Sequence, residues 1–404
     1  MLLSAVHDVG GFPALVVLRG VCAAAVGLSI YASCRSKRAS ARTACAVTVI
    51  AYIVAMPYLA LRPQMLGAVL FAACVLVLAV RQRHPWAMWA IPFITALWVN
   101  LHGSFVLAVA VVAFAMLEDV VQRRPTWKTT IAVAGATIAA TLLSPFGTNV
   151  WAYVSSLATD PIIRNAVEEW RPPTIDTLGG ALFMSAIVAL GGILARRGRV
   201  LSWLDLAWLV GFSLLALSAQ RNVLWWIVAV MPLVASMIPG RSSASETPRG
   251  ARIMNGAILS VLGVALVAAL PWVGPRRPIV SGMPPAPLVA AADRQLPAGA
   301  RVFVYQPWAS WVEFASPDVR VFVDSRIEIF PESVWQEYQT AAAGGHDYHK
   351  VLDSWGVDAV MLPTDGSSLV GALAEDPAWI LAYEDERGLL FIRDLATSTS
   401  PVPA

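Results

Sequence analysis

The sequence is poor in charge. Of its 404 residues, 14% are charged and 57% are hydrophobic, whereas a soluble protein carries about 25% charged residues. This shortage excludes a large soluble protein, and the apolar excess predicts an integral membrane protein. The net charge of +3 is too small to indicate nucleic acid as a partner.

Cysteine is also scarce, and several chemical motifs are missing. The four cysteines all lie in or beside apolar runs of the first third: Cys22, Cys34, Cys45 and Cys74. Their spacing matches neither a disulfide framework nor a zinc site. The sequence has no phosphate-cradling glycine loop, no nucleophile elbow and no internal repeat. It therefore identifies no cofactor, and a divalent metal has no ligand set to support it, because His346 and His349 lack a third partner.

Long apolar runs stand where charge is missing. We predict about ten membrane-spanning helices, near residues 11–33, 44–61, 65–80, 87–101, 104–118, 129–143, 179–195, 203–219, 222–239 and 253–272. Several are shorter than the ~20 residues that cross a bilayer upright. The alternative for one short pair is a re-entrant hairpin that enters and leaves the membrane on the same side. The predicted fold class is a polytopic α-helical membrane protein.

Lysine and arginine alternate between the connections of these helices. They gather in the odd-numbered connections, as Arg35, Lys37, Arg38, Arg42, Arg81, Arg83, Arg123, Arg124, Lys128, Arg196, Arg197, Arg199, Arg241, Arg249 and Arg252. The even-numbered connections carry at most Arg62, Arg221, or the pair Arg164 and Arg171. Because basic loops stay in the cytoplasm, we predict that the even connections, the N-terminus and everything after about residue 273 face outward from the plasma membrane.

An outward N-terminus needs an export signal. Residues 1–11 contain neither the basic start nor the apolar middle of a signal peptide. We therefore expect that a preceding span is missing and that the chain is truncated at its start.

Polar clusters interrupt the apolar runs in the connections predicted to face outward. In one of them Asn100, His102 and Ser104 alternate with apolar residues between two runs. Polar side chains at the edge of a membrane span indicate a functional site. The alternative is a helix turn whose polar residues cap the helix ends.

Arginines and carboxylates in the other outer connections are further candidates. Arg62, beside Gln64, and Arg221 are permanent cations suited to a phosphate, and the alternative role for each is an interfacial anchor. Glu168 and Glu169 are the only close carboxylate pair in the membrane half outside the basic loops. As chain neighbours they do not face one another, so one can serve as a base or cation ligand while the other is solvated. The alternative is a wholly solvated loop.

The composition changes after residue 272. Residues 273–300 are rich in proline and glycine, which indicates a linker. In residues 301–394 the pattern of strands alternating with helices predicts a small extracytoplasmic α/β domain. We predict that residues 395–404 form a disordered tail. Asp324 and Arg326 follow the second predicted strand at its carboxyl end, where such folds bind ligands. The alternative is an Asp–Arg pair that fixes a turn.

Taken together, these motifs resemble a bacterial membrane family. In order they are Arg62-Pro63-Gln64, Asn100 to Phe105, Ser144-Pro145-Phe146-Gly147, Glu169-Trp170-Arg171-Pro172 and Arg221-Asn222, then Val321 to Arg326, Asp358-Ala359-Val360, and Trp379 with Tyr383 and Asp385. The family resembles the GT-C glycosyltransferases, the class that contains protein mannosyltransferase-like and lipopolysaccharide-core (Rgt-type) enzymes. The resemblance covers about residues 10–394.

The resemblance implies transfer of a sugar from a polyprenyl-phosphate donor to an acceptor in the cell envelope. The usual base of that class is an acidic residue in the first outer loop, which is the part expected to be missing here, and Asp8 is not in a matching motif. The base would be Glu168, Glu169 or a residue outside this chain. Arg62, Arg221 and Arg171 would hold the phosphate, and His102 would position it.

Two functions remain open at this point. The first is a membrane glycosyltransferase, inactive if the missing segment carries the base. The second is a non-catalytic membrane protein whose outer α/β domain binds a cell-envelope polymer or a protein partner. A transporter is disfavoured, because the sequence lacks the inverted repeats typical of that class.

Overall fold

The structure is a computed structural model, and it describes residues 2–159, 168–197, 201–238, 283–364 and 367–394. The chain divides into two compact units, Met1–Arg276 and Arg277–Ala404. The predicted tenth span (253–272) and the predicted tail (395–404) lie outside the described residues.

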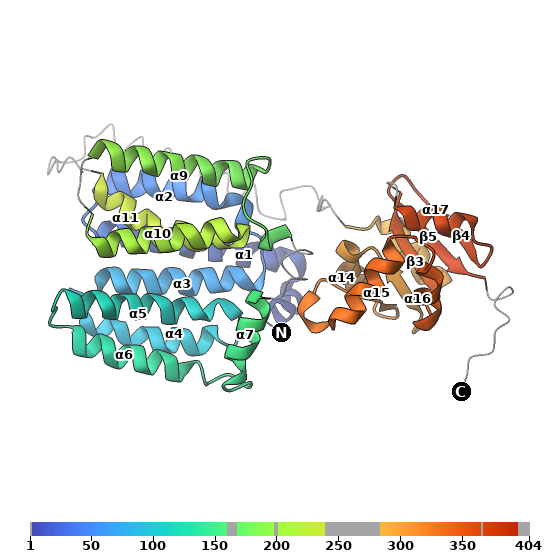
Figure 1. The fold of residues 1–404 in the computed structure, drawn as a ribbon, viewed down its shortest axis with the longest axis horizontal. Helices are drawn as coiled ribbons and strands as arrows, with labels where there is room; N and C mark the ends of the chain where they lie inside the picture. The colour runs from blue at the N-terminus through green and yellow to red at the C-terminus, as the bar shows by residue number, and fades with distance from the viewer. Residues whose placement is uncertain (1, 160–167, 198–200, 239–282, 365–366, 395–404) are drawn as a thin grey trace. The chain divides into compact units, whose positions relative to one another are not determined.

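The first unit is a bundle of helices (Figure 1). Each of the nine predicted spans that fall on described residues contains a helix: α1 (Leu2–Ser36), α2 (Ala41–Ala55), α3 (Pro63–Val80), α4 (Ala90–Trp98), α5 (Val106–Val121), α6 (Trp127–Ala140), α9 (Leu178–Arg197), α10 (Trp203–Ser218) and α11 (Val223–Met237). A further helix, α7 (Asn149–Thr159), lies across the ends of the bundle helices rather than along them (Figure 1). Single 3-10 turns fill several connections, as η1 (Met56–Tyr58), η2 (Pro85–Trp89), η3 (Gly103–Phe105), η4 (Glu168–Trp170) and η5 (Gln220–Asn222).

Five helical segments of the described chain are long and apolar enough to cross a membrane. They are Leu2–Ser36, Ala41–Tyr58, Pro63–Val80, Gly103–Val121 and Leu178–Arg196. The other bundle helices are shorter, and α10 is a shorter apolar helix. The structure therefore has the helices of a membrane protein, with fewer of full length than the ten predicted.

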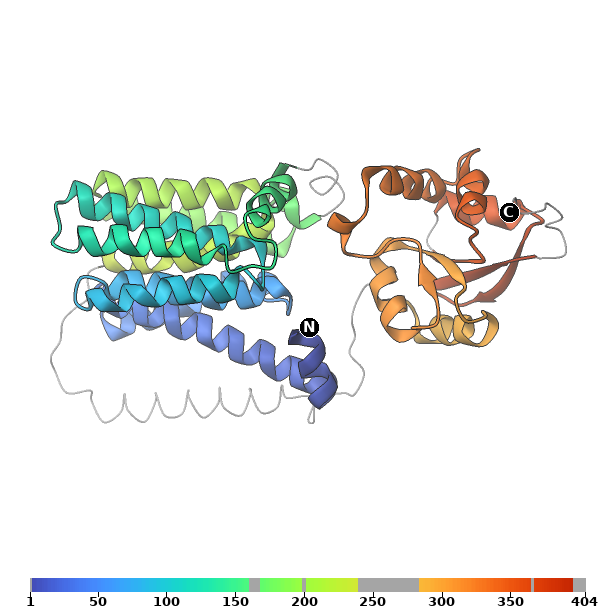
Figure 2. The ribbon, with the colours of Figure 1, turned by 90° about the horizontal axis from the view of Figure 1, so that it is seen from below.

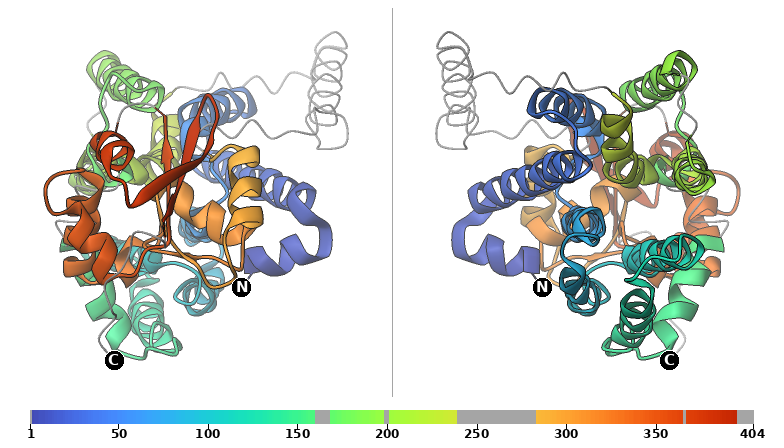
Figure 3. Two further views of the ribbon diagram at one scale, coloured as in Figure 1. Left: turned by 90° about the vertical axis from the view of Figure 1, so that its right-hand side faces the viewer. Right: turned by 90° about the vertical axis from the view of Figure 1, so that its left-hand side faces the viewer.

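Helix α11 is the centre of the bundle. It packs against α1, α2, α3, α9 and α10, and nearly all of its residues are buried. An aromatic cluster surrounds its first turn, where Trp225 contacts both Phe71 and Trp98 and Trp226 contacts Phe183. A helix that is apolar on every side is one that is covered on every side, which explains why its sequence shows no polar face. The helices are seen end-on in Figure 3.

Large apolar side chains also cover the outside of the bundle. Among them, Leu28, Val49, Phe93, Val188 and Leu214 are all more than half exposed. An apolar surface this extensive is unusual for a soluble protein and suits a bilayer.

The second unit is a five-stranded sheet with helices on both sides (Figure 2). The strands are β1 (Arg301–Val304), β2 (Arg320–Val321), β3 (Ala359–Pro363), β4 (Trp379–Glu384) and β5 (Gly388–Arg393), in the order β2-β1-β3-β5-β4. β2, β1 and β3 are parallel, and β5 and β4 complete the sheet as an antiparallel hairpin. The helices are α13 (Ala286–Gln295), α14 (Gln306–Ala315), α15 (Glu332–Ala342), α16 (Tyr348–Ser354) and α17 (Ser368–Glu375). The strands and the last four helices lie within residues 301–394, where the sequence predicts alternating strands and helices.

Helix α13 is a difference from the prediction, because it lies inside the predicted linker (273–300). Leu288, Val289 and Ala292 of this helix are buried in a core that includes Val302 and Trp308. The short helix begins after Pro285, and prolines before a helix are a common start signal. The sequence prediction assigned this segment to the linker because of the prolines and glycines around it, whereas its amphipathic helix belongs to the folded unit.

Candidate functional site

Four connections predicted to face outward meet at one end of the helical unit, here called the Arg221 end. Arg62, just before α3, forms an ion pair with Glu169 in η4. The Gln64 side chain donates a hydrogen bond to the carbonyl of Arg221 in η5 (2.8 Å). The Arg221 guanidinium lies 3.3 Å from Nε2 of His102, in the α4–α5 connection. The α4–α5 connection therefore belongs to the same cluster as the three connections that carry Arg62, Glu169 and Arg221.

Local contacts hold η4 and η5 together. The main-chain N–H of Gln220 donates to the carbonyl of Arg171 (2.9 Å), and the Arg221 guanidinium stacks over the Trp170 ring, 4.4 Å from its centroid. A cation over an indole face gains about 0.5–1 kcal/mol at an exposed site. The predicted phosphate ligand Arg221 is therefore held by the Trp170 ring, which its guanidinium covers, and by the Gln64 side chain, which binds its carbonyl.

Pro63 explains how Arg62 reaches this cluster. It occupies the first position of α3, where a proline has a suitable φ and no N–H is needed. The residue before a proline is extended, and Arg62 has φ −136° and ψ 164°. This backbone directs Arg62 away from the helix axis toward η4.

His102 is anchored beneath Arg221 by Ser104 and Trp98. The hydroxyl of Ser104 lies 2.6 Å from Nδ1 of His102 and accepts a hydrogen bond from the Trp98 indole (3.2 Å). Gly67 of α3 makes room for this contact, because a Cβ at that position would lie 2.8 Å from the Trp98 indole nitrogen. The imidazole is thus fixed from the side of the bundle core.

Burial and the positive charge of Arg221 lower the pKa of His102 from 6.5 to about 4, so the imidazole is neutral at pH 7. The main-chain N–H of Ser104 points at Nδ1 (3.1 Å), and Arg221 approaches Nε2. Both partners are donors, whereas a neutral imidazole has one acceptor nitrogen. Only one of these two contacts is a hydrogen bond at a time. An anion beside Arg221 would resolve this conflict by accepting from both the guanidinium and Nε2–H.

A pocket of about 400 Å³ opens at the Arg221 end. Four predicted site residues line it, namely Arg62, Gln64, Glu169 and Arg221. Tyr58 of η1 also lines it, and its buried hydroxyl has no hydrogen-bond partner within the described residues. An unsatisfied buried hydroxyl costs about 1–3 kcal/mol, so Tyr58 is a polar residue of this pocket whose hydrogen-bonding capacity the described protein does not use.

The sequence analysis did not single out Tyr58. It ends an apolar run, where an interfacial tyrosine is ordinary. Its position four residues before Arg62 in the same connection is the signal that could have identified it.

The remaining candidates of the helical unit do not line this pocket. Asn100 is exposed and donates to the carbonyls of Ala96 (2.8 Å) and Leu143 (3.1 Å), so it closes the turn between α4 and the end of α6. Arg171 contributes its carbonyl to Gln220 and does not line the pocket. The side chain of Glu168 lies outside the described residues.

Asp324 and Arg326 belong to the second unit and contact one another. Asp324 is buried and accepts from both the main-chain N–H (2.6 Å) and the guanidinium Nε (2.8 Å) of Arg326. Arg326 also pairs with Glu313 (3.1 Å). The geometry is that of an Asp–Arg pair that fixes a turn, the alternative to a binding role.

The opposite end of α3 carries a different cluster, here called the Arg81 network. Asp119 at the end of α5 is fully buried and accepts from Thr126 (2.8 Å), Thr130 (2.7 Å) and Arg81 (3.3 Å). Arg81 also pairs with Glu118 (2.5 Å). These residues join the third and fifth connections, both of which are basic in the sequence.

No metal site is evident in the ranges that the structure describes. No group of three or more His, Cys, Asp or Glu side chains there is arranged to hold an ion. In comparisons with known proteins, the sequence matches no family model and no curated protein.

Proposed function

We propose that this chain is an integral membrane glycosyltransferase that moves a sugar from a polyprenyl-phosphate donor to an acceptor in the cell envelope. In this proposal the pocket at the Arg221 end receives the donor's phosphate. The observation that carries it is the convergence of Arg62, Gln64, Glu169 and Arg221 around one pocket at the end of an apolar bundle.

The balance of donors and acceptors favours an anion in this pocket. Two guanidinium groups, the Gln64 amide and the Tyr58 hydroxyl surround it, and Glu169 is the single carboxylate among its described lining residues. Arginine forks match the geometry of phosphate oxygens. The exposed apolar surface of the bundle would meanwhile accommodate a long polyprenyl chain within the bilayer.

The chemistry follows from these positions. The hydroxyl oxygen of the acceptor attacks the anomeric carbon of the sugar, and the bond from that carbon to the phosphate oxygen breaks. The electron pair leaves with the polyprenyl phosphate, whose charge Arg221 and Arg62 stabilise. The proton of the hydroxyl passes to the carboxylate of Glu169, which lines the pocket and pairs with Arg62.

A transfer assay tests this proposal. Membranes that contain the protein are supplied with a mixture of labelled polyprenyl-phosphate sugars, and labelled envelope product is measured. Wild type and Arg83→Ala are expected to transfer label, whereas Arg221→Ala and Glu169→Gln are expected to lose it. Arg83 is a matched control, because it is an exposed arginine at the other end of the bundle. No transfer by correctly inserted wild type would contradict the proposal.

The orientation is part of the same proposal. We propose a multi-pass protein of the plasma membrane, with about ten spans and with the Arg221 end and the second unit outside the cytoplasm. The alternation of basic connections supports this. In a variant whose four cysteines are replaced by serine, a membrane-impermeant maleimide added to whole cells should label Asn100→Cys and spare Arg83→Cys. The reverse pattern would overturn the orientation.

One observation favours the second function, a non-catalytic membrane anchor that binds an envelope polymer. The second unit has a pocket of its own, of about 340 Å³, lined in part by Arg301 and Arg320. Wild-type protein that inserts correctly and transfers no sugar would favour this function.

A further inference from the structure

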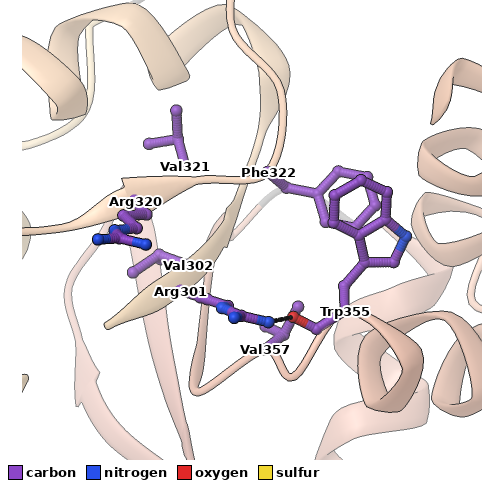
Figure 4. Close-up of a pocket in the computed structure, with 7 residues that line it drawn as sticks. All are labelled: Arg301, Val302, Arg320, Val321, Phe322, Trp355 and Val357. Atoms are coloured by element: carbon purple, nitrogen blue, oxygen red, sulfur yellow. Dashed lines mark hydrogen bonds between the residues drawn. The ribbon is translucent and has the colours of Figure 1, made fainter. Parts of the chain in front are cut away.

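The pocket of the second unit lies where β1 and β2 begin (Figure 4). Two arginines, Arg301 and Arg320, line it, and the aromatic rings of Phe322 and Trp355 lie against one another on one side. Three valines complete the lining. A concave site with apolar walls and a few polar groups, in the range of about 300–1,000 Å³, is typical of small-molecule binding.

The two arginines are neighbours in the sheet register. Arg301 of β1 pairs directly with Arg320 of β2. Two residues further along, Phe303 and Phe322 contact one another, with ring centroids 5.4 Å apart, so residues 301, 303, 320 and 322 share one face of the sheet. Like charges directly across from each other destabilise a sheet, unless an anion lies between them.

Among the residues that the structure describes, one of the two guanidinium groups has a protein partner and the other has none. Arg301 Nη1 donates to the carbonyl of Trp355 (2.7 Å). Gly356 at φ +58° leaves space for this contact, since a Cβ there would lie 3.2 Å from the same nitrogen. The guanidinium of Arg320 has neither an ion pair nor a hydrogen bond with any residue that the structure describes.

The carboxylate that contacts Arg301 binds its main chain and not its guanidinium. Asp358 accepts from the main-chain N–H of Arg301 (2.8 Å) and is not among the residues that line the pocket. The Trp355 wall is in turn fixed, because its indole donates to Glu337 (2.5 Å) on α15. The pocket therefore presents two adjacent cations beside a rigid aromatic surface.

We propose that this pocket binds an oxyanion, a phosphate or carboxylate carried on a body the size of one sugar. Arginine forks form bidentate hydrogen bonds with such groups, and an anion between Arg301 and Arg320 removes their mutual repulsion. The aromatic and valine walls contact the body of the ligand. This site is separate from the pocket at the Arg221 end, and it stands whether or not the chain transfers sugar.

Isothermal titration of the full chain in neutral-lipid nanodiscs with glucose 1-phosphate tests the proposal. Wild type and Arg387→Ala are expected to bind it alike, and Arg320→Ala at least tenfold more weakly. Arg387 is a matched control, because it is an exposed arginine in the β4–β5 turn of the same unit. Glucose itself should not bind. Equal affinity of Arg320→Ala and wild type, or equal binding of glucose, would overturn the proposal.

Two further measurements keep the result interpretable. Without ligand, Arg320→Ala should unfold at the wild-type temperature or above it, because the substitution removes only a repulsive charge, so lost binding cannot be ascribed to misfolding. The titration is then repeated in nanodiscs that contain phosphatidylglycerol. Unchanged affinity identifies a soluble oxyanion as the ligand, and lost affinity identifies a lipid headgroup that competes for Arg320. An Arg320→Ala protein that unfolds well below wild type would show that Arg320 serves the fold and would overturn the proposal.

Discussion

The two ends of the helical unit use charged residues in opposite ways. In the Arg81 network two guanidinium groups, of Arg81 and Arg124, pair with the carboxylates of Glu118 and Asp119. Asp119 also accepts from two threonine hydroxyls, and Arg81 Nε is left without a partner among the described residues. At the Arg221 end Glu169 is the single carboxylate among the described residues that line the pocket, beside the two guanidinium groups of Arg62 and Arg221. Arg81, Glu118 and Arg124 also line a pocket, so the two ends differ in charge balance and not in the presence of a pocket.

The difference distinguishes a cluster that stabilises the fold from one suited to a ligand. Most buried polar groups that serve the fold satisfy one another, as Asp119 and its four partners do, because an unsatisfied group costs about 1–3 kcal/mol. A binding site keeps part of that capacity for its ligand. Substitutions in the Arg81 network should therefore affect stability first, and substitutions at the Arg221 end should affect activity first.

The largest effect on stability is expected from Asp119→Ala. It leaves the buried guanidinium of Arg81 with one carboxylate fewer and removes the acceptor of Thr126 and Thr130. Breaking a buried charge pair costs about 3–5 kcal/mol, so the unfolding temperature in detergent should fall sharply. Arg83→Ala, at an exposed position on the connection that carries Arg81, is the control. An Asp119→Ala protein as stable as this control would contradict the proposal that the Arg81 network stabilises the fold.

Arg221→Ala should show the reverse pattern. It removes one cation–π contact and one contact to His102, together worth about 1–2 kcal/mol, while the hydrogen bond from Gln64 to its carbonyl remains. Sugar transfer should fall by more than tenfold. Parallel measurement of transfer and unfolding temperature checks this, and a variant that loses stability but keeps transfer would assign Arg221 to the fold.

The pH dependence of the protein's stability should reflect the lowered pKa of His102. Its pKa is lowered from 6.5 to about 4 by burial and by Arg221, so between these values the unfolded chain binds a proton that the folded protein does not. Stability should therefore fall as the pH drops from about 6.5 toward 4, and it should be independent of this group above 6.5.

His102→Gln provides the comparison for that experiment, because glutamine stays neutral throughout. The unfolding temperature of wild type should fall more between pH 7 and pH 5 than that of His102→Gln. In Arg221→Ala the pKa of His102 should rise but stay below 6.5, because burial remains. Equal pH dependence of wild type and His102→Gln would show that the imidazole is not shielded as the structure indicates.

The smallest effect is expected from Asn100→Ala. The side chain is exposed and bonds only two carbonyls, so its loss should cost about 1 kcal/mol or less and leave transfer unchanged. Thermal unfolding and the transfer assay measure both. A loss of transfer as large as that of Arg221→Ala would extend the functional site to the α4–α5 turn.

Local patterns predicted much of this molecule. Apolar runs indicated the helices of the first unit, because a helix that crosses a bilayer needs a continuous apolar stretch. The predicted alternation of strands with helices after residue 300 indicated the α/β fold of the second unit. The alternation of basic residues grouped Arg62, His102 and Arg221 on one side, and the structure brings these three residues into one cluster. That grouping required no knowledge of the packing.

Contacts between distant segments were beyond the sequence. Which of Glu168 and Glu169 meets Arg62 depends on the course of η4, and the unsatisfied hydroxyl of Tyr58 depends on how α9 packs against η1. Asp119 appears in the sequence as an ordinary acidic residue near a helix end, and only the packing of α5 against α6 buries it. Helix α13 was missed because prolines and glycines surround a short amphipathic stretch.

Binding of polyprenyl phosphate is the most direct test of the account. The unfolding temperature of the purified protein is measured with polyprenyl phosphate and with the uncharged polyprenol of the same length, for wild type, Arg221→Ala and Arg83→Ala. The account predicts that the phosphate, but not the alcohol, stabilises wild type and Arg83→Ala and that Arg221→Ala does not respond. Equal stabilisation of Arg221→Ala, or equal stabilisation by the alcohol, would contradict it.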